Sequence, residues 1–202
     1  QRLYTLTKEQ SDEYERLWEE YETAKLNEDP TKELNKELLE GGIYRRYISN
    51  LMIPYTEQFV DKILAHDEKC IIACCFDEEL YTLKEYYGNK CVIYNGKMSI
   101  KQKDAAKDAF MNDPNIKVFI GNIDSAGVGL TLTAARFVVF NDFSYGDYLN
   151  KQMEDRVYRI GQTKDCYIYY QMFKGTEYER MYNITQRKNN ISETLIKKES
   201  DK

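Results

Sequence analysis

Two arginines that lie three residues apart, Arg156 and Arg159, are the side chains of this sequence best suited to chemistry. Arginine keeps its positive charge at physiological pH, and its planar guanidinium group can bind two phosphate oxygens at once. Residues at this spacing share one face of a helix, so the two cations are expected to act together. Such a pair can stabilise the charge that develops while a γ-phosphate is cleaved. The alternative is an exposed helix with ordinary surface salt bridges.

The arginines belong to a longer string, Q-x-x-D-R-x-x-R-I-G-Q at residues 152–162, which is far more restrictive than their spacing alone. The string resembles motif VI of the Swi/Snf-type DNA translocases, a branch of the superfamily-two helicase-like ATPases. This resemblance implies that Arg156 and Arg159 are catalytic residues at the γ-phosphate of ATP and that Gln152 orients the transition-state region. It also implies that Asp155 lies near the nucleotide. Because a buried unpaired guanidinium is costly, both arginines are expected to be partly exposed.

A second segment, rich in small residues, carries the string S-A-G-V-G-L-T-L-T-A-A at residues 125–135. Small residues let a backbone approach a ligand or another domain closely. The string resembles motif V of the same family, whose loop touches both the nucleotide and the nucleic-acid backbone. The resemblance therefore implies nucleotide contacts for Gly127 and Gly129. It implies nucleic-acid contacts for Asn122 and Ser125.

A third segment, Y-N-G-K-M-S at residues 94–99, resembles the strand–Asp-Gly–Ser segment of the family, with Asn95 in place of the usual Asp. The resemblance implies that Asn95 and Lys97 contact the nucleic-acid backbone. Gly96 and Lys97 do not make a phosphate loop. That motif reads G-x-x-x-x-G-K-[ST], and Cys91 stands where its first glycine belongs.

Strand and helix patterns alternate along most of the chain, which predicts an α/β fold with a parallel sheet. Continuous apolar runs, typical of buried parallel strands, predict strands at residues 70–76, 91–94, 117–120, 137–140 and 167–170. Capping boxes predict helices that begin at Thr7 and Ser99. A further helix is predicted from Ser144 to Gly161, carrying the arginine pair. The resemblance implies that this sheet is RecA-like and flanked by helices.

The first part of the chain shows helical patterns only and is expected to be all-α. One buried face of its first helix is predicted from residues at helical spacing: Tyr14, Leu17, Trp18 and Tyr21. A second helix is predicted between Asp29 and Gly41, and a third over residues 43–65, interrupted at Pro54. The chain is thus divided into a helical section at 1–66, a RecA-like lobe at 67–186 and a polar tail at 187–202.

Composition argues against several classes of protein. Five cysteines without a CxxC pair and a single histidine, His66, argue against a metal site and for reduced thiols inside a cell. No apolar run approaches the ~20 residues that cross a bilayer, so no membrane partner is expected. Residues 1–40 hold 6 basic and 12 acidic side chains, so the net charge of −5 still permits a basic groove elsewhere. The chain starts at Gln1 without an initiator methionine or a signal peptide, so we expect an excised fragment or a processed product.

Neither a phosphate loop nor a strand that ends in an Asp-Glu pair occurs. The resemblance therefore implies that ATP and Mg²⁺ are held mainly by a first RecA-like lobe of the same parent chain. The expected function is the C-terminal motor lobe of an ATP-dependent double-stranded DNA translocase, inactive by itself. The expected location is the nucleus if the source is eukaryotic and the cytoplasm if it is bacterial or phage.

The wording G-L-T-L-T-A-A favours the annealing-helicase-like subgroup over the nucleosome remodellers. Three alternatives stay open at this point. They are a lobe of a strand-separating helicase of the same superfamily, a non-catalytic RecA-like scaffold, and a free-standing α/β enzyme that acts on a small molecule.

Overall fold

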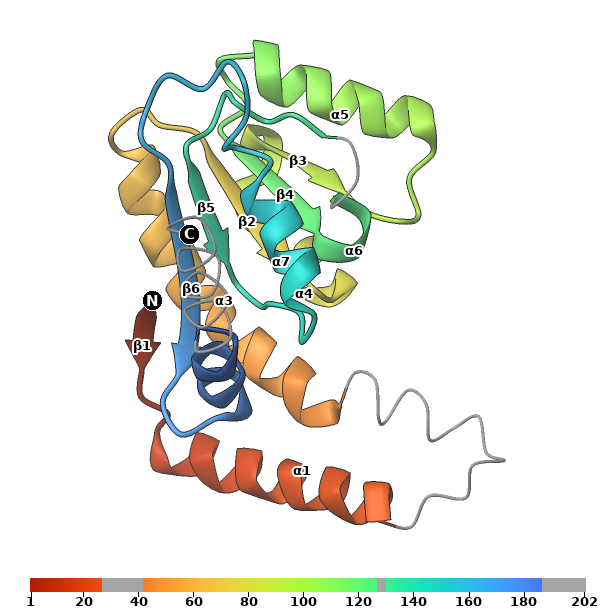
Figure 1. Ribbon diagram of the computed structural model, residues 1–202, viewed down its shortest axis with the longest axis vertical. Helices are drawn as coiled ribbons and strands as arrows, with labels where there is room; N and C mark the ends of the chain where they lie inside the picture. Colours follow the sequence, from red (N-terminus) through yellow and green to blue (C-terminus); the bar gives the residue numbers. More distant parts are fainter. Residues whose placement is uncertain (27–41, 127–129, 187–202) are drawn as a thin grey trace, which may run out of the picture.

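One six-stranded parallel sheet forms the centre of the molecule (Figure 1). The computed structural model describes residues 1–26, 42–126 and 130–186. The strands are β1 Arg2–Tyr4, β2 Cys70–Cys74, β3 Cys91–Tyr94, β4 Val118–Asn122, β5 Phe137–Phe140 and β6 Tyr167–Phe173. They follow the order β1-β6-β5-β2-β4-β3, and every neighbouring pair is parallel. The predicted α/β fold is confirmed, because the five apolar runs are the five long strands.

Helices cover both faces of the sheet (Figure 1). They are α1 Lys8–Leu26, α3 Ile43–Leu64, α4 Asp77–Tyr87, α5 Ile100–Asn112, α6 Ile123–Ala126 and α7 Asp147–Glu154, with a 3₁₀ turn at Gly88–Lys90 and a helix at 177–186. Side chains alternate along a strand, so β2 contributes to two cores. Ile72 packs in a core with Val60 of α3 and Leu80 of α4. Ile71 packs on the other face, in a core that includes Phe110 of α5.

Local sequence signals set two of the helix starts. The hydroxyl of Thr7 accepts from the amide of Gln10 at 3.2 Å, and the Gln10 side chain accepts from the Thr7 amide at 2.9 Å. Ser99 and Gln102 make the same reciprocal pair at the start of α5. Both predicted capping boxes are confirmed.

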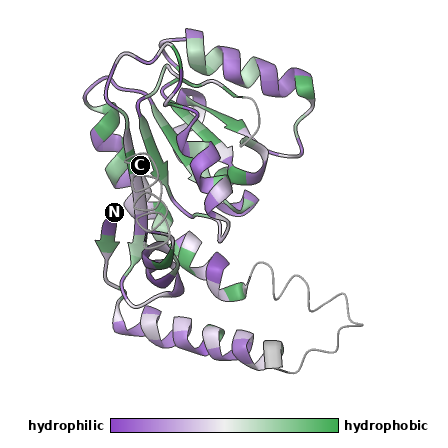
Figure 2. Cartoon of the chain, in the orientation of Figure 1, coloured by the Kyte–Doolittle hydropathy of each residue, from purple (hydrophilic) through white to green (hydrophobic). Residues whose placement is uncertain are grey.

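The sheet and the outer helices differ in hydropathy. Figure 2 shows that the central strands are largely hydrophobic, whereas α1 and α5 carry mostly hydrophilic residues.

The front section is not all-α, because β1 adds an edge strand beside β6, with Leu3 opposite Met172. Three residues are too short for a periodic signal. The prediction that Pro54 interrupts the third helix is also wrong. α3 continues through the proline, since Met52 and Thr56 on either side of it are almost fully buried. Packing therefore outweighs the local cost of roughly 3 kcal/mol.

The predicted buried face of α1 is confirmed. Tyr14 and Leu17 are buried, and Trp18 packs edge-on against Tyr44 of α3 with ring centroids 4.9 Å apart. The second front helix and the polar tail lie outside the described residues. The division of the chain at residue 66 stays a prediction.

Candidate functional site

The arginine segment, residues 155–162, is not helical. α7 ends at Glu154, and the chain continues in tight turns, so the prediction that the helix runs to Gly161 is wrong. The Nε of Arg156 takes the carbonyl oxygen of Gln152, which the Arg156 amide would need in a continuing helix, and that amide donates instead to Met153 at 3.2 Å. Beyond the turn, the amide of Leu132 donates to the carbonyl oxygen of Arg156 at 2.9 Å.

Arg156 is turned into the protein, with 4% of its surface exposed. Its Nε donates to the carbonyl oxygen of Gln152 at 2.6 Å, and its Nη1 donates to that of Leu130 at 2.9 Å. Burial, together with the charge of Arg159, lowers the pKa of Arg156. The expected partial exposure is therefore wrong for Arg156. A buried guanidinium is tolerated here because backbone oxygens replace the water it loses.

Arg159 lies on the surface of the same segment, where its Nη1 donates to the hydroxyl of Thr131 at 3.0 Å. Its expected exposure is confirmed. Asp155 is also exposed, and Gln152 is half-buried at the end of α7. The structure thus brings Arg159 against the loop that resembles motif V, while Arg156 lies beneath it.

Gln162 joins the two segments, a role that the sequence did not suggest. Its side-chain amide donates to the carbonyl oxygens of Ala135 at 2.9 Å and Thr133 at 3.3 Å. Its side-chain oxygen accepts from the amide of Lys164 at 3.1 Å. The only hint of this role in the sequence was the place of Gln162 as the final glutamine of the Q-x-x-D-R-x-x-R-I-G-Q string. The predicted nucleotide residues Gly127 and Gly129, in the same loop, lie outside the described residues.

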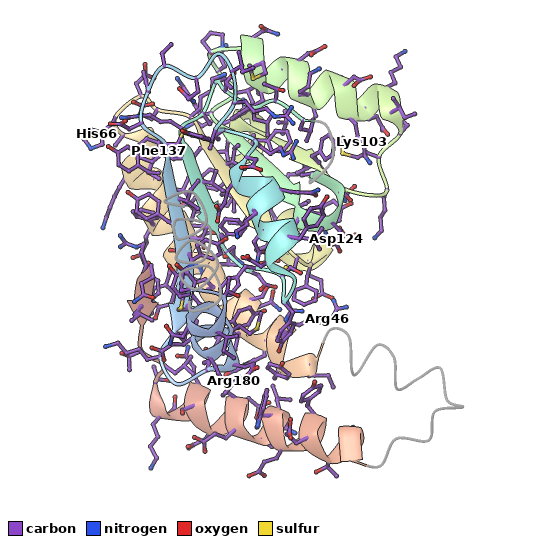
Figure 3. The ribbon with its side chains drawn as sticks, in the orientation of Figure 1. Arg46, His66, Lys103, Asp124, Phe137 and Arg180 are labelled. Atoms are coloured by element: carbon purple, nitrogen blue, oxygen red, sulfur yellow. The ribbon has the colours of Figure 1, made fainter. Side chains whose placement is uncertain are left out.

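A second group of predicted residues lies where β2, β3 and β4 end. Figure 3 shows Arg46 and Asp124 near this end of the sheet, while His66 and Phe137 lie at the opposite end. Parallel sheets bind their ligands beyond the carboxyl ends of the strands. A hollow of about 630 Å³ is present here, and Lys97 and Asn122 line it.

Asn95 belongs to this group by position, yet its side chain is buried, with 1% exposed. Its amide nitrogen donates to the hydroxyl of Tyr81 at 3.2 Å and lies 3.4 Å from the carboxylate of Asp77. Its oxygen accepts from the amide of Lys97 at 3.2 Å. In this structure Asn95 shapes the loop that presents Lys97, and contact of Asn95 itself with a nucleic-acid backbone stays a prediction.

The other three predicted nucleic-acid residues are accessible to different degrees. The Lys97 side chain is 74% exposed and forms an ion pair with Asp77 at 2.8 Å. Asn122 is half-buried and donates to the carbonyl oxygen of Cys75 at 2.9 Å. Ser125 is half-buried, and a Cβ added at Gly96 would lie only 3.2 Å from its Oγ. The third segment and the motif V segment therefore meet at Gly96, which lines this hollow.

Within residues 1–26, 42–126 and 130–186, no three His, Cys, Asp or Glu side chains gather closely enough to hold a metal ion. In the same part of the chain, no helix has the length and apolar character needed to span a bilayer.

The all-parallel sheet, its flanking helices and the linked arginine and glycine segments define a RecA-like α/β lobe. The helicase conserved C-terminal domain family matches residues 55–161, and the chain belongs to this family as a C-terminal lobe of the Swi/Snf type. The match ends within the arginine segment.

Its relatives are Swi/Snf-related proteins. Helicase SWR1 of Gibberella zeae is 30% identical over 146 residues, which cover 69% of this chain and 9% of the relative. The SWI/SNF-related matrix-associated actin-dependent regulator of chromatin subfamily A-like protein 1 homolog of Caenorhabditis elegans is 38% identical over 94 residues, 46% of this chain and 14% of the relative. The chain thus spans a small part of these proteins. The annealing-helicase-like subgroup stays a prediction.

Among solved structures, the Sulfolobus solfataricus SWI2/SNF2 ATPase core in complex with double-stranded DNA matches with a TM-score of 0.67 at 22% identity. The match covers 94% of this chain and 43% of that core. It confirms the RecA-like fold. It also extends to nearly the whole chain, beyond the residues that the family match includes.

Proposed function

We propose that this chain is the C-terminal motor lobe of an ATP-dependent double-stranded DNA translocase. In this proposal Arg159 reaches the γ-phosphate of ATP bound on a first RecA-like lobe of the same parent chain. The observation that carries it is the exposed guanidinium of Arg159 on a segment held in place by Gln162 and Arg156. An oriented cation of this kind stabilises charge in phosphoryl transfer. Direct contact of Arg156 with the phosphate stays a prediction.

The nucleotide and its metal ion are assigned mainly to the first lobe. This chain offers no phosphate loop, and its described residues hold no carboxylate cluster for Mg²⁺. Gln152 and Asp155 flank the arginines and are the proposed further residues on the nucleotide side. Gly127 and Gly129 are proposed for the same side from sequence alone.

Double-stranded DNA is proposed to bind at the hollow beyond β2, β3 and β4. Lys97 and Arg46 are the cations that line it, and Lys97 would exchange its ion pair with Asp77 for a phosphate. Asn122 and Ser125 would contribute neutral hydrogen bonds. Contacts of this kind follow the backbone and carry little sequence information, so binding should weaken as salt rises.

Closure of the two lobes around ATP would move the DNA contacts of each lobe along the duplex. The resemblance of the two motifs to those of the Swi/Snf-type translocases favours a translocase over a strand-separating helicase or a non-catalytic scaffold. The relative from Caenorhabditis elegans is named as a regulator of chromatin, which supports a nuclear location if the source is eukaryotic.

The test uses the full-length ATPase that contains this chain. A triplex-displacement assay should be positive in the presence of ATP, because tracking along a duplex removes the third strand. A forked-duplex assay should release little strand. Efficient strand release without triplex displacement would instead show a strand-separating helicase, and no ATP turnover with any DNA would show a scaffold.

A further inference from the structure

The arginine segment presents two apolar side chains on either side of Arg159. Ile160 has a relative exposure of 104% and Tyr158 of 76%. Single exposed apolar residues are ordinary on protein surfaces. These two are distinguished by their place, because they are the immediate chain neighbours of the exposed arginine.

The segment that carries them is held in place. The amide of Gln162 donates to the carbonyl oxygen of Arg159 at 2.9 Å, and its side chain donates to Ala135 at 2.9 Å. Gly161 completes the turn with a φ of 103°, a conformation that favours glycine. Side chains that protrude from an ordered backbone lose little freedom on binding, so this pair is prepared for contact.

Apolar and cationic groups meet beside the pair. Tyr158, Arg159, Ile160, Gln162 and Lys164 line a hollow of about 520 Å³. The isoleucine side chain has neither a charge nor a hydrogen-bonding group, so it forms no ion pair or hydrogen bond with a phosphate chain or a DNA backbone. Its complement is an apolar recess on another protein surface.

A protein surface must come close to this point if Arg159 acts on a nucleotide held elsewhere. The chain spans 43% of the solved ATPase core that it matches, so a second body of comparable size completes that core. Consecutive Cα atoms are only about 3.8 Å apart. Any approach of Arg159 to a nucleotide on the other lobe therefore brings Tyr158 and Ile160 to the same lobe.

We propose that Ile160 and Tyr158 dock into an apolar recess beside the nucleotide on the first lobe when the two lobes close. The proposal rests on the function proposed above and adds the residues that position its arginine. Ile160 is a positioning residue: it fixes where the Arg159 guanidinium stands relative to the γ-phosphate. Contact made only in the closed state should affect the turnover rate more than the binding of ATP.

The first test compares Ile160→Asn with Ile100→Asn in the full-length ATPase. Ile100 is a matched control because it is also an exposed isoleucine, 80% exposed, at the start of α5. Both variants should keep the wild-type Tm, since neither side chain packs in the core. Ile160→Asn should lower kcat for DNA-stimulated ATP hydrolysis about 10- to 100-fold, as expected for one lost apolar anchor, with KM for ATP nearly unchanged. Equal kcat in the two variants would overturn the proposal, and so would a lower Tm for Ile160→Asn alone.

A second measurement does not depend on turnover. p-Benzoylphenylalanine is placed at position 160, and in a control protein at position 100, and each is irradiated with DNA and a non-hydrolysable ATP analogue. Crosslinked peptides from the first lobe at position 160 but not at position 100 would support docking. Crosslinks to DNA, or none above the control, would overturn it. Failure of the proposed function is read separately, as absent ATP turnover in the wild-type protein.

Discussion

Arg156 donates a hydrogen bond of 2.9 Å from its Nη1 to the carbonyl oxygen of Leu130. This bond links the arginine segment to the motif V segment, between residues 26 positions apart in the sequence. A second bond runs the other way, from the amide of Leu132 to the carbonyl oxygen of Arg156 at 2.9 Å. The two arginines of the motif therefore have different surroundings. Arg156 is buried and holds the arginine segment in place, and Arg159 is exposed on the surface of that segment.

We predict that Arg159→Ala abolishes DNA-stimulated ATP turnover in the full-length protein without changing its stability. Loss of a comparable arginine in related phosphoryl transfer lowers the rate by roughly 10³–10⁵. The side chain is exposed and makes one hydrogen bond, to Thr131, so thermal unfolding should be unchanged. Steady-state ATPase assays and a melting curve check both parts. Near wild-type turnover would show that Arg159 has no catalytic role.

Arg156→Ala should lower both turnover and stability. Removal of this guanidinium leaves the carbonyl oxygens of Gln152 and Leu130 without these donors, which costs about 1–3 kcal/mol when such groups are buried. Urea unfolding of the two alanine variants, side by side, measures the difference. Equal stability of Arg156→Ala and Arg159→Ala would contradict the supporting role of Arg156.

The sequence predicted the parts of this fold that depend on local information. The apolar runs that became β2 and β5 are buried on both faces of the sheet, so their pattern is unambiguous. The capping boxes at Thr7 and Ser99 are built from residues three apart and need no other part of the chain.

The sequence failed where long-range contacts decide the structure. α7 ends at Glu154, where the Arg156 side chain turns inward to the carbonyl oxygens of Gln152 and Leu130, and no local pattern signals the bond to Leu130. Asn95 is buried against Tyr81 and Asp77 of α4, although the resemblance implied contact with a nucleic-acid backbone. The residue types of the site and the exposure of Arg159 could be predicted from the motifs, but the burial of Arg156 and Asn95 could not.

Gln162 should be as important for stability as a core residue. Gln162→Glu replaces its donating amide with a carboxylate that faces the carbonyl oxygens of Thr133 and Ala135. The loss of these bonds and the repulsion should cost about 1–3 kcal/mol. Gln102→Glu is the matched control, since glutamate serves equally well at that position of a capping box. Equal urea midpoints for the two variants would show that Gln162 does not hold the segments together.

The chain by itself should turn over no ATP. It lacks a phosphate loop, so the β- and γ-phosphates and Mg²⁺ have no cradle on this lobe. Phosphate release from the purified 202-residue chain, with ATP and Mg²⁺, is the measurement. Saturable hydrolysis that depends on Mg²⁺ would contradict the assignment of the nucleotide to another lobe.

From the burial of Glu79 we predict that the stability of the fold depends on pH. Its carboxyl group is fully buried and accepts from the amides of Cys75 at 2.7 Å and Phe76 at 2.9 Å, and from the hydroxyl of Ser49 at 2.8 Å. Burial, with the neighbouring carboxyl of Asp142, raises the pKa of Glu79 to about 8, and the hydrogen bonds from Phe76, Ser49 and Asn141 only partly offset the increase.

The folded pKa of Glu79 therefore lies above the value of about 4.3 for an unfolded chain. Between these values the folded state keeps a proton that the unfolded state has lost, so stability from this group falls as pH rises from about 4 to about 8. Glu79→Gln removes the titration while keeping the size of the side chain. The free energy of unfolding of the wild type minus that of Glu79→Gln should decrease between pH 5 and pH 8, as measured by urea titration at each pH. A difference that is constant or increases with pH would show that the buried carboxyl is ionised throughout and that its hydrogen bonds outweigh its burial.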